Sequence, residues 1–523
     1  MATLTRRNAA AAAAIQRPLA PDLLGFVSAA LISSPPTLTA SPAIRDRVIV
    51  LLVGAALLVA YGVSVRLGPA LADEFIYLSG ARHFARTGRL DARYYDASAI
   101  VARGYPHQDV HAPGYVILLG AFDRAAGATN AAAIALNVMA FAGGALLVYA
   151  IAQALGVERR RARIAALLAL LLPGALPYVF WAMPETVLAA LVLAALALAA
   201  GGEERSGRAA AAGLVLGLAL LVRESALFAL PAMLALLRGR ARRAAFVAFV
   251  AFGLLVYTPL SRARAPGGAN FWAPSGGRTF GFEAVQAAGR GRVGAAASLV
   301  ARRVAANVSE LLAPATTWTE RSILATYLAL PLLALARWSA LPVRSRRYLV
   351  GLLLGFVAVV ALLFGVYVVV QWSGYRYAMF LMPAFLPLVV GAGGRAWAVP
   401  AGLALAGLLL LLGARTVFDD YKASRQRRQA GIADYVERYL PTPPARLVLP
   451  NGWLYGWRHD PTEVISSLDD GAALRRLERV IPFDYLVVPA GTALHQDTES
   501  RERYQRVNRD DAGAPLAIFR RLR

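Results

Sequence analysis

The sequence predicts an all-α protein that crosses a membrane many times and carries a small α/β domain at its C-terminal end. Apolar runs of about 20 residues, long enough to cross roughly 30 Å of hydrocarbon as helices, recur along the first 415 positions. Hydrophobic residues make up 58% of the chain and charged residues only 16%, and the mean hydropathy is +0.52. Short arginine-rich loops separate many of the apolar runs, which is typical of loops that stay in the cytoplasm.

These basic loops set the direction of the spans. The sequences ERRRAR at 158–163, RGRARR at 238–243 and RSRR at 344–347 all fall on one side when about eleven spans run from an inner N-terminus to an outer C-terminus. Two long segments, 67–128 and 262–320, are then outer loops. The predicted spans cover residues of about 46–66, 130–155, 163–179, 184–200, 209–222, 225–237, 244–260, 322–337, 348–370, 378–393 and 397–414.

The membrane domain is therefore predicted over residues 45–415, with a different segment on each side of it. Residues 1–44 are rich in Ala and Pro and are expected to be cytoplasmic and disordered. Residues 416–523 are more polar, and RLVLP at 446–450 and FDYLVVP at 483–489 have the character of buried strands. The sequence DDGAALRRLERVI between them has helical spacing, so this segment is predicted to form a small α/β domain outside the membrane.

Charge and cysteine content exclude several classes of function. The net charge is +24, with 55 Lys and Arg against 31 Asp and Glu. In a soluble chain this excess would suggest nucleic acid, but arginines in short cytoplasmic loops explain it here, and the expected surroundings are membrane lipid. The absence of cysteine excludes disulfides, thiolate catalysis and Cys-ligated metals.

Ionisable side chains from distant segments are predicted to meet at the outer face of the membrane. Each alone could be a paired or snorkelling interfacial residue, and tyrosines there could form an aromatic belt. Together they indicate a site, because charges within apolar sequence are costly unless they are paired or used. The residues are Asp73 and Glu74 after the first span, His111 in the first outer loop, Glu185, Arg223 and Glu224 at outer turns, and Arg376 and Tyr377 near the end of the membrane domain.

This set of residues fits the transfer of a sugar from a lipid phosphate with inversion. One carboxylate near the anomeric carbon can take the proton of the acceptor hydroxyl. The leaving group is already a phosphate, so it needs cations or a metal ion rather than a second acid. One well-placed acid with arginines at the membrane edge is therefore the expected arrangement.

Four segments carry a resemblance to a known superfamily. They are the acidic pair of ADEFIY, the segment HAPGY that closes the first outer loop, the Arg–Glu pair of VRESALFALP, and RYAMFLMPAFLP. In their order, spacing and common side of the membrane they resemble the GT-C membrane glycosyltransferases, whose members include protein O-mannosyltransferases and the lipid A aminoarabinose transferase. The resemblance covers residues of about 46–415. It implies a polyprenyl-phosphate sugar as donor and a glycan, lipid or protein as acceptor, at the outer side of a bacterial cytoplasmic membrane.

The resemblance also implies roles for individual residues. Asp73 and Glu74 would be the catalytic pair, one of them the base, and Arg376, Arg223 and His111 would face the donor phosphate. Glu185 would occupy a second acidic position found in relatives, with Glu224 and Tyr377 in support. A divalent metal at Asp73, Glu74 and His111 is left open, since family members differ in needing one. HAPGY stands where some relatives have a Lys-Pro-Pro segment.

Several alternatives stay open at this point. A membrane enzyme that joins or polymerises glycans from a lipid-diphosphate donor would also need outer arginines, but not an acidic pair directly after the first span. A transporter or flippase for a lipid-linked sugar would place its charges at mid-bilayer and often show an internal repeat. The outer C-terminal domain could bind the acceptor or serve as a cap.

Overall fold

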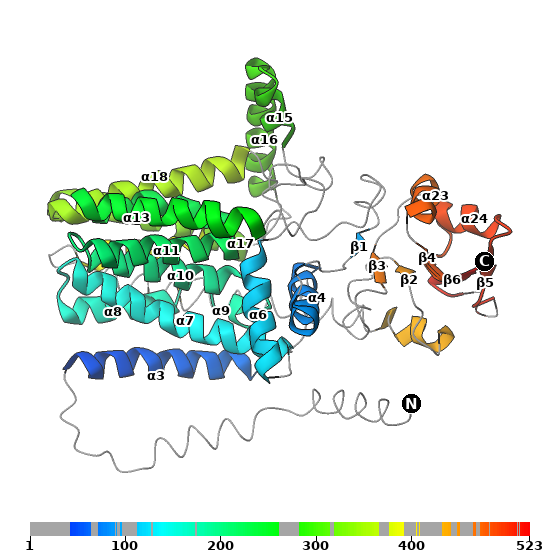
Figure 1. Ribbon diagram of the computed structural model, residues 1–523, viewed down its shortest axis with the longest axis horizontal. Coiled ribbons are helices and arrows are strands. Elements are labelled where there is room, and N and C mark those ends of the chain that lie inside the picture. The colour runs from blue at the N-terminus through cyan, green and yellow to red at the C-terminus, as the bar shows by residue number, and fades with distance from the viewer. Residues whose placement is uncertain are drawn as a thin grey trace, which may run out of the picture.

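The chain forms a bundle of helices with a small sheet domain beyond one end (Figure 1). In the computed structural model, the part of the chain described is 42–63, 72–88, 90, 95–96, 112–126, 129–172, 175–260, 282–313, 318–365, 376–391, 404, 407, 431–432, 434–440, 447–449, 464–466, 471–480, 482–509, 511 and 513–522. The N-terminal segment 1–41 lies outside it.

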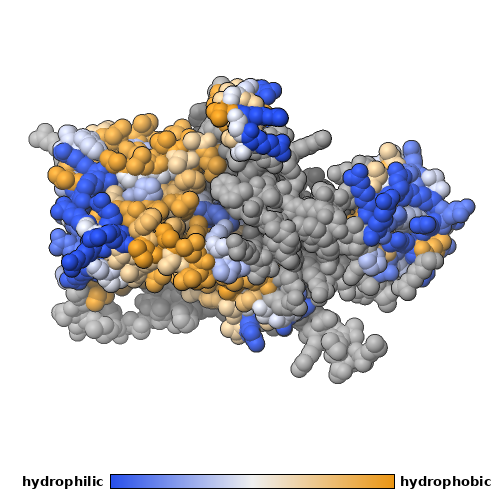
Figure 2. Space-filling view, turned by 45° about the horizontal axis from the view of Figure 1, so that its top comes forward, coloured by the Kyte–Doolittle hydropathy of each residue, from blue (hydrophilic) through white to orange (hydrophobic). Residues whose placement is uncertain are grey.

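The long helices of the bundle run beside one another, and their apolar side chains form one large core. Figure 2 shows the outer surface of the bundle as an apolar belt, with hydrophilic residues gathered at one end. An apolar exterior around an apolar core is expected where lipid takes the place of water. The helices are α3 (Pro42–Gly62), α7 (Thr129–Ala154), α8 (Arg159–Leu170), α10 (Glu185–Ala200), α11 (Ser206–Val222), α13 (Gly239–Phe252), α17 (Trp318–Ala336), α18 (Val343–Gly365) and α20 (Met382–Gly391).

Among the described residues, three helical stretches are long and apolar enough to cross a membrane: Asn130–Ala154, Gly239–Leu260 and Val343–Leu362. The second includes a π-helical turn, η2 (Gly253–Tyr257), at the end of α13. Five further apolar helices are shorter. The helices and their belt are those of a multi-pass membrane protein, and the number of eleven spans stays a prediction. The last predicted span, 397–414, lies outside the described residues apart from two positions.

Two predicted spans are interrupted where the sequence contains proline. The span predicted over 163–179 is divided into α8 and a short α9 (Ala175–Val179); Leu171 and Leu172 belong to neither helix, and Pro173 and Gly174 lie outside the described residues. The span predicted over 225–237 consists of a 3₁₀ helix, η1 (Glu224–Ala229), followed by α12 (Leu230–Leu236). Pro231 stands in the first turn of α12, where a proline starts a new helix without losing a needed N–H group.

Both predicted outer loops contain helices of their own. The first holds α4 (Ala72–Thr87) and α6 (Pro113–Ala126), and the second holds α15 (Phe282–Gly289) and α16 (Val293–Leu312). Figure 1 shows α6, α15 and α16 crosswise to the bundle, at the end nearest the sheet domain. A short turn, α19 (Arg376–Met379), precedes α20, and η3 (Trp338–Ala340) links α17 to α18.

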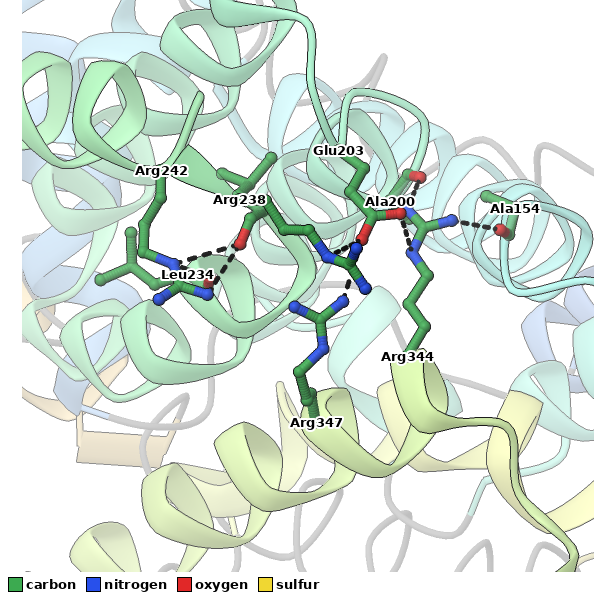
Figure 3. A network of polar contacts seen from close by, with 9 residues as sticks. Ala154, Ala200, Glu203, Leu234, Arg238, Arg242, Arg344 and Arg347 are labelled. Atoms are coloured by element: carbon green, nitrogen blue, oxygen red, sulfur yellow. Dashed lines mark hydrogen bonds and ion pairs between the residues drawn. The ribbon is translucent and has the colours of Figure 1, made fainter. Parts of the chain in front are cut away.

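The basic loops meet at the other end of the bundle, as the sequence predicts. Glu203 contacts three arginines: Arg238, just before α13, at 2.8 Å, and Arg347 and Arg344, at the start of α18, at 2.9 Å and 3.2 Å (Figure 3). Arg344 also donates hydrogen bonds to the carbonyl oxygens of Ala154 and Ala200, the last residues of α7 and α10. Cations there satisfy carbonyls that have no partner within the helix and oppose the negative end of its dipole.

The C-terminal domain is built on a six-stranded sheet of order β1-β3-β2-β4-β6-β5. In this order, β1, β3, β2 and β4 pair in parallel, and β6 pairs antiparallel with both β4 and β5. The predicted strands at 446–450 and 483–489 are β2 and β4, and the predicted helix between them is α23. β1 comes from the first outer loop, where Tyr95 pairs with Ile465, so that loop is tied to the C-terminal domain. The elements are β1 (Tyr95–Asp96), β2 (Leu447–Leu449), β3 (Val464–Ser466), β4 (Tyr485–Pro489), β5 (Tyr504–Arg506), β6 (Leu516–Arg521), α23 (Gly471–Val480) and α24 (Ala493–Glu499).

Candidate functional site

Four of the predicted site residues form one cluster at the end of the bundle opposite the basic loops. Glu185 is the first residue of α10, and Arg223 directly follows the last residue of α11. Asp73 lies in the first turn of α4, and Arg376 is the first residue of α19. Glu185 stands at the end of α10 opposite Ala200, which contacts Arg344, and the ion pairs of the other three residues bring them to the same end.

Alternating carboxylates and guanidiniums link the four residues into a chain. Arg376 Nη1 donates a hydrogen bond of 2.9 Å to Asp73 Oδ2, across 303 positions of sequence. Arg376 Nε lies 3.9 Å from Glu185 Oε1, and the same oxygen accepts a hydrogen bond from Arg223 Nη1. The order Asp73–Arg376–Glu185–Arg223 therefore balances two negative charges with two positive ones.

Burial differs sharply along this chain of charges. The side chain of Glu185 is 1% exposed, those of Arg223 and Arg376 are 12% and 14% exposed, and that of Asp73 is 28% exposed. A carboxylate as buried as Glu185 needs close cations, because an unpaired charge removed from water is strongly unfavourable. Glu185 Oε2 has no hydrogen-bond partner among the described residues.

Glu74 is oriented differently from its neighbour Asp73. It is 1% exposed, and its Oε2 accepts a hydrogen bond of 3.1 Å from the backbone N–H of Ala182. Both carboxylates stand in the first turn of α4, where the helix dipole favours negative charge. The structure thus places Asp73 against the arginines and Glu74 against the loop that precedes α10.

That loop is held by a residue that sequence reasoning missed. Asn137, in the middle of α7, is fully buried and its Nδ2 donates to the carbonyl oxygens of Trp181 at 2.7 Å, Tyr178 at 3.2 Å and Met183 at 3.4 Å. Tyr115 donates to Asn137 Oδ1 at 3.4 Å. An amide inside an apolar span, away from its ends, is a signal that could have identified this position.

The HAPGY segment has a packing role in the described residues. Pro113 begins α6, and Gly114 lies against the end of α11, where a Cβ at position 114 would stand 2.6 Å from the backbone carbon of Leu221. Real Cβ atoms essentially never approach so closely, so glycine is required unless α11 moves. Since Arg223 lies two residues beyond Leu221, Gly114 helps to fix where that arginine emerges.

The remaining predicted residues are not part of the ion-pair chain. Glu224 opens η1, and its Oε1 accepts a hydrogen bond of 3.1 Å from Tyr257, in the π-helical turn. Tyr377 lies in α19, but its side chain is outside the described residues, and so is the whole of His111.

The described residues do not assemble a metal site. Within them, no group of three or more His, Asp or Glu side chains is arranged to hold a metal ion. The carboxylates of Asp73 and Glu185 contact arginines, and that of Glu74 contacts a backbone N–H. His111, the third predicted ligand, is outside the described residues, so a metal there stays a prediction and no step below depends on one.

The geometry offers a carboxylate and two guanidiniums to one ligand. Guanidinium groups bind phosphate through paired N–H donors, and a carboxylate beside them can accept a proton. Asp73, the most exposed member, is the one that a ligand arriving from solvent would meet.

Solved structures share this architecture. The chain superposes on ArnT from Cupriavidus metallidurans bound to undecaprenyl phosphate with a TM-score of 0.55 and 14% identity, covering 90% of this chain and 98% of that one. The apo oligosaccharyltransferase of Archaeoglobus fulgidus gives a TM-score of 0.54 and 13% identity, over 86% of this chain and 70% of that one. This chain has the GT-C fold. The oligosaccharyltransferase AglB from the same archaeon, in complex with an inhibitory peptide and a dolichol-phosphate, matches with a TM-score of 0.51 and 14% identity, over 87% of this chain and 70% of that one.

The GT-C fold was expected from the motifs, and the structural match confirms it. No protein-family model and no curated protein matches the sequence. At this low identity the match establishes the fold of the GT-C bundle, while the roles of its residues rest on their geometry.

Proposed function

We propose that the protein is an inverting glycosyltransferase that moves a sugar from a polyprenyl-phosphate donor to an acceptor hydroxyl. The observation that carries the proposal is the contact of Asp73 with Arg376, and of Arg376 and Arg223 with the buried Glu185. It places one accessible carboxylate beside two cations at the end of an apolar bundle. A lipid phosphate bound in a membrane has its anionic head at such a boundary and its apolar tail in the hydrocarbon beside it.

The reaction follows from the chemistry of these groups. Asp73 accepts the proton of the acceptor hydroxyl as its oxygen attacks the anomeric carbon, and the bond from that carbon to the phosphate oxygen breaks. The polyprenyl phosphate leaves with the bonding electrons, and the guanidiniums of Arg376 and Arg223 stabilise its charge. Attack opposite the leaving group inverts the anomeric centre.

Known complexes of the same fold support the choice of donor. The ArnT structure contains undecaprenyl phosphate, and the AglB structure contains a dolichol-phosphate. Both carriers are polyprenyl phosphates, whose single charged group matches two arginines better than an extended anion would. Glu74, held by the Ala182 N–H, is proposed to keep α4 and hence Asp73 in position.

The proposed location is the outer side of a bacterial cytoplasmic membrane. The cluster lies at the end opposite Glu203 and its arginines, and basic loops normally remain in the cytoplasm. A periplasmic reporter fused after residue 420 is expected to be active, and an inactive reporter would refute this orientation.

The test of function uses the purified full chain with undecaprenyl-phosphate-linked, radiolabelled pentoses, hexoses and aminoarabinose, and lipid, glycan or peptide acceptors. Wild type is expected to transfer at least one sugar, and Asp73→Asn to lose at least 100-fold in rate, as removal of a general base typically does (about 10²–10⁴). Asp123→Asn, on α6, is the matched control and should retain activity. Full activity of Asp73→Asn would remove the proposed base, and the use of diphosphate-linked donors alone would favour a glycan ligase instead.

A further inference from the structure

In the structure Asp73 is paired with Arg376, the residue that is proposed to bind the donor phosphate. Arg376 Nη1 donates to Asp73 Oδ2 at 2.9 Å. A carboxylate oxygen that accepts a guanidinium hydrogen bond is held in its ionised form and is a poorer proton acceptor. The base and the phosphate-binding arginine therefore restrain one another as long as they remain paired.

The two carboxylates that contact Arg376 differ in how readily they release it. Glu185 is 1% exposed, and it also binds Arg223, so loss of its contacts would leave a buried charge poorly compensated. Asp73 is 28% exposed, and water or an acceptor can solvate it after separation. An incoming phosphate is thus expected to replace Asp73 and to leave Glu185 in place.

We propose that the donor phosphate takes Arg376 from Asp73, so that the base is released only after the donor has bound. This inference rests on the proposed function. Glu185 keeps Arg223 and Arg376 at the head of α10 during the exchange, because its Oε1 lies against both guanidiniums. The order of binding is donor first, and an acceptor that arrives alone meets no free base. After transfer, Asp73 gives its proton to water, the carrier phosphate leaves, and Arg376 returns to Asp73.

The exchange predicts that Asp73 competes with the phosphate. The test is the Kd of radiolabelled undecaprenyl phosphate, which carries no sugar, for the full chain in detergent. Asp73→Asn removes the competitor and should tighten binding about fivefold, which corresponds to about 1 kcal/mol for a partly exposed ion pair. Asp123→Asn is the matched control, since it removes one negative charge from α6, outside the ion-pair chain, and its Kd should stay within about twofold.

A double-mutant cycle separates exchange from general repulsion. In an Arg376→Ala background, Asp73→Asn should leave the Kd unchanged, because no arginine remains to be released. Equal tightening in both backgrounds, or equal tightening by Asp123→Asn, would overturn the exchange and indicate simple charge repulsion. Weaker binding by Asp73→Asn would also overturn it, since Asp73 would then be orienting Arg376 for the phosphate. If binding by Arg376→Ala is too weak to measure, the comparison of Asp73→Asn with Asp123→Asn decides.

The same measurements distinguish failure of this inference from failure of the proposed function. If wild type binds undecaprenyl phosphate but Asp73→Asn does not tighten binding, the exchange is wrong and the donor assignment stands. If wild type shows no binding at all, the proposed function is wrong and the exchange falls with it. Thermal unfolding of each variant verifies that the fold is retained.

Discussion

Replacement of Asn137 by leucine tests whether the loop before α10 is held from within the bundle. Leucine has the same number and branching of side-chain heavy atoms as asparagine, so Asn137→Leu removes the hydrogen bonds without opening a large cavity. The bonds lost are those to the carbonyl oxygens of Trp181, Tyr178 and Met183, and the one from Tyr115.

The expected cost can be worked from these distances. The bond to Trp181 at 2.7 Å is strong, the one to Tyr178 at 3.2 Å is moderate, and the two at 3.4 Å are weak. A buried group left without a partner costs about 1–3 kcal/mol, whereas hydrogen bonds within membrane proteins average only about 0.6 kcal/mol. One strong, one moderate and two weak bonds therefore give about 2–3 kcal/mol in total. The loop also carries the Ala182 N–H, so Glu74 and the head of α10 should shift.

The assay combines unfolding with transfer. Asn137→Leu should lower the Tm by several degrees and reduce kcat at least tenfold, because displacements of about 1 Å at a site can cost up to 100-fold. Asn508→Leu is the matched control, since Asn508 is an equally buried amide with three hydrogen bonds in the C-terminal domain. It should lower stability and leave the Kd for undecaprenyl phosphate unchanged. An Asn137→Leu protein with wild-type Tm and kcat would refute this reasoning.

Three further predictions follow from packing, charge and pH. Gly114→Ala should push back the end of α11 at Leu221, lower the Tm because the added Cβ meets backbone atoms, and raise the KM for the donor. An unchanged KM would show that this contact does not position Arg223. Arg223→Ala should lower the free energy of unfolding by about 3 kcal/mol, since Glu185 loses its closest described cation, and Arg223→Lys should recover part of it; equal stability of all three proteins would contradict this. Burial raises the pKa of Tyr435 to about 12, so the folded state favours the neutral phenol. The contribution of this neutral phenol to stability is complete below pH of about 10 and is lost as pH rises through about 12. Between those two pH values, denaturant unfolding should show a smaller loss in the free energy of unfolding for Tyr435→Phe than for wild type.

The gathering of charges at two ends of the bundle could be predicted from sequence because it depends on local pattern. The short arginine-rich connections all fall on the same side of the predicted spans. The structure accordingly brings Glu203, Arg238 and Arg344 together at one end. Asp73 and Arg376 were visible as ionisable residues at the edges of apolar segments.

The partners of those residues could not be predicted in the same way. Nothing in the local sequence indicates that Arg376 pairs with Asp73, 303 positions away, or that Glu74 turns instead toward the Ala182 N–H. These choices depend on how α4, α10 and α19 pack, which periodicity does not encode. The position of Asn137 inside an apolar span could have drawn attention to it, but its partners, the carbonyl oxygens before α10, depend on the same packing.

Broken helices and distant strand pairing were also beyond the sequence. Hydropathy alone gives a continuous apolar run over 225–237, whereas the structure has a 3₁₀ helix and then α12, started by Pro231. The pairing of Tyr95 with Ile465 joins two segments that are about 370 positions apart in the printed sequence, and two-residue strands have no periodic signal.

A structure of the full chain with bound undecaprenyl phosphate, determined by electron cryomicroscopy, tests the central claim most directly. The account predicts phosphate density within about 3 Å of the guanidinium nitrogens of Arg376 and Arg223, with Asp73 separated from Arg376 and facing open space beside the phosphate. Phosphate density at the opposite end, among the arginines around Glu203, or a carrier bound with the Asp73–Arg376 contact intact and no phosphate contact to either arginine, would contradict it.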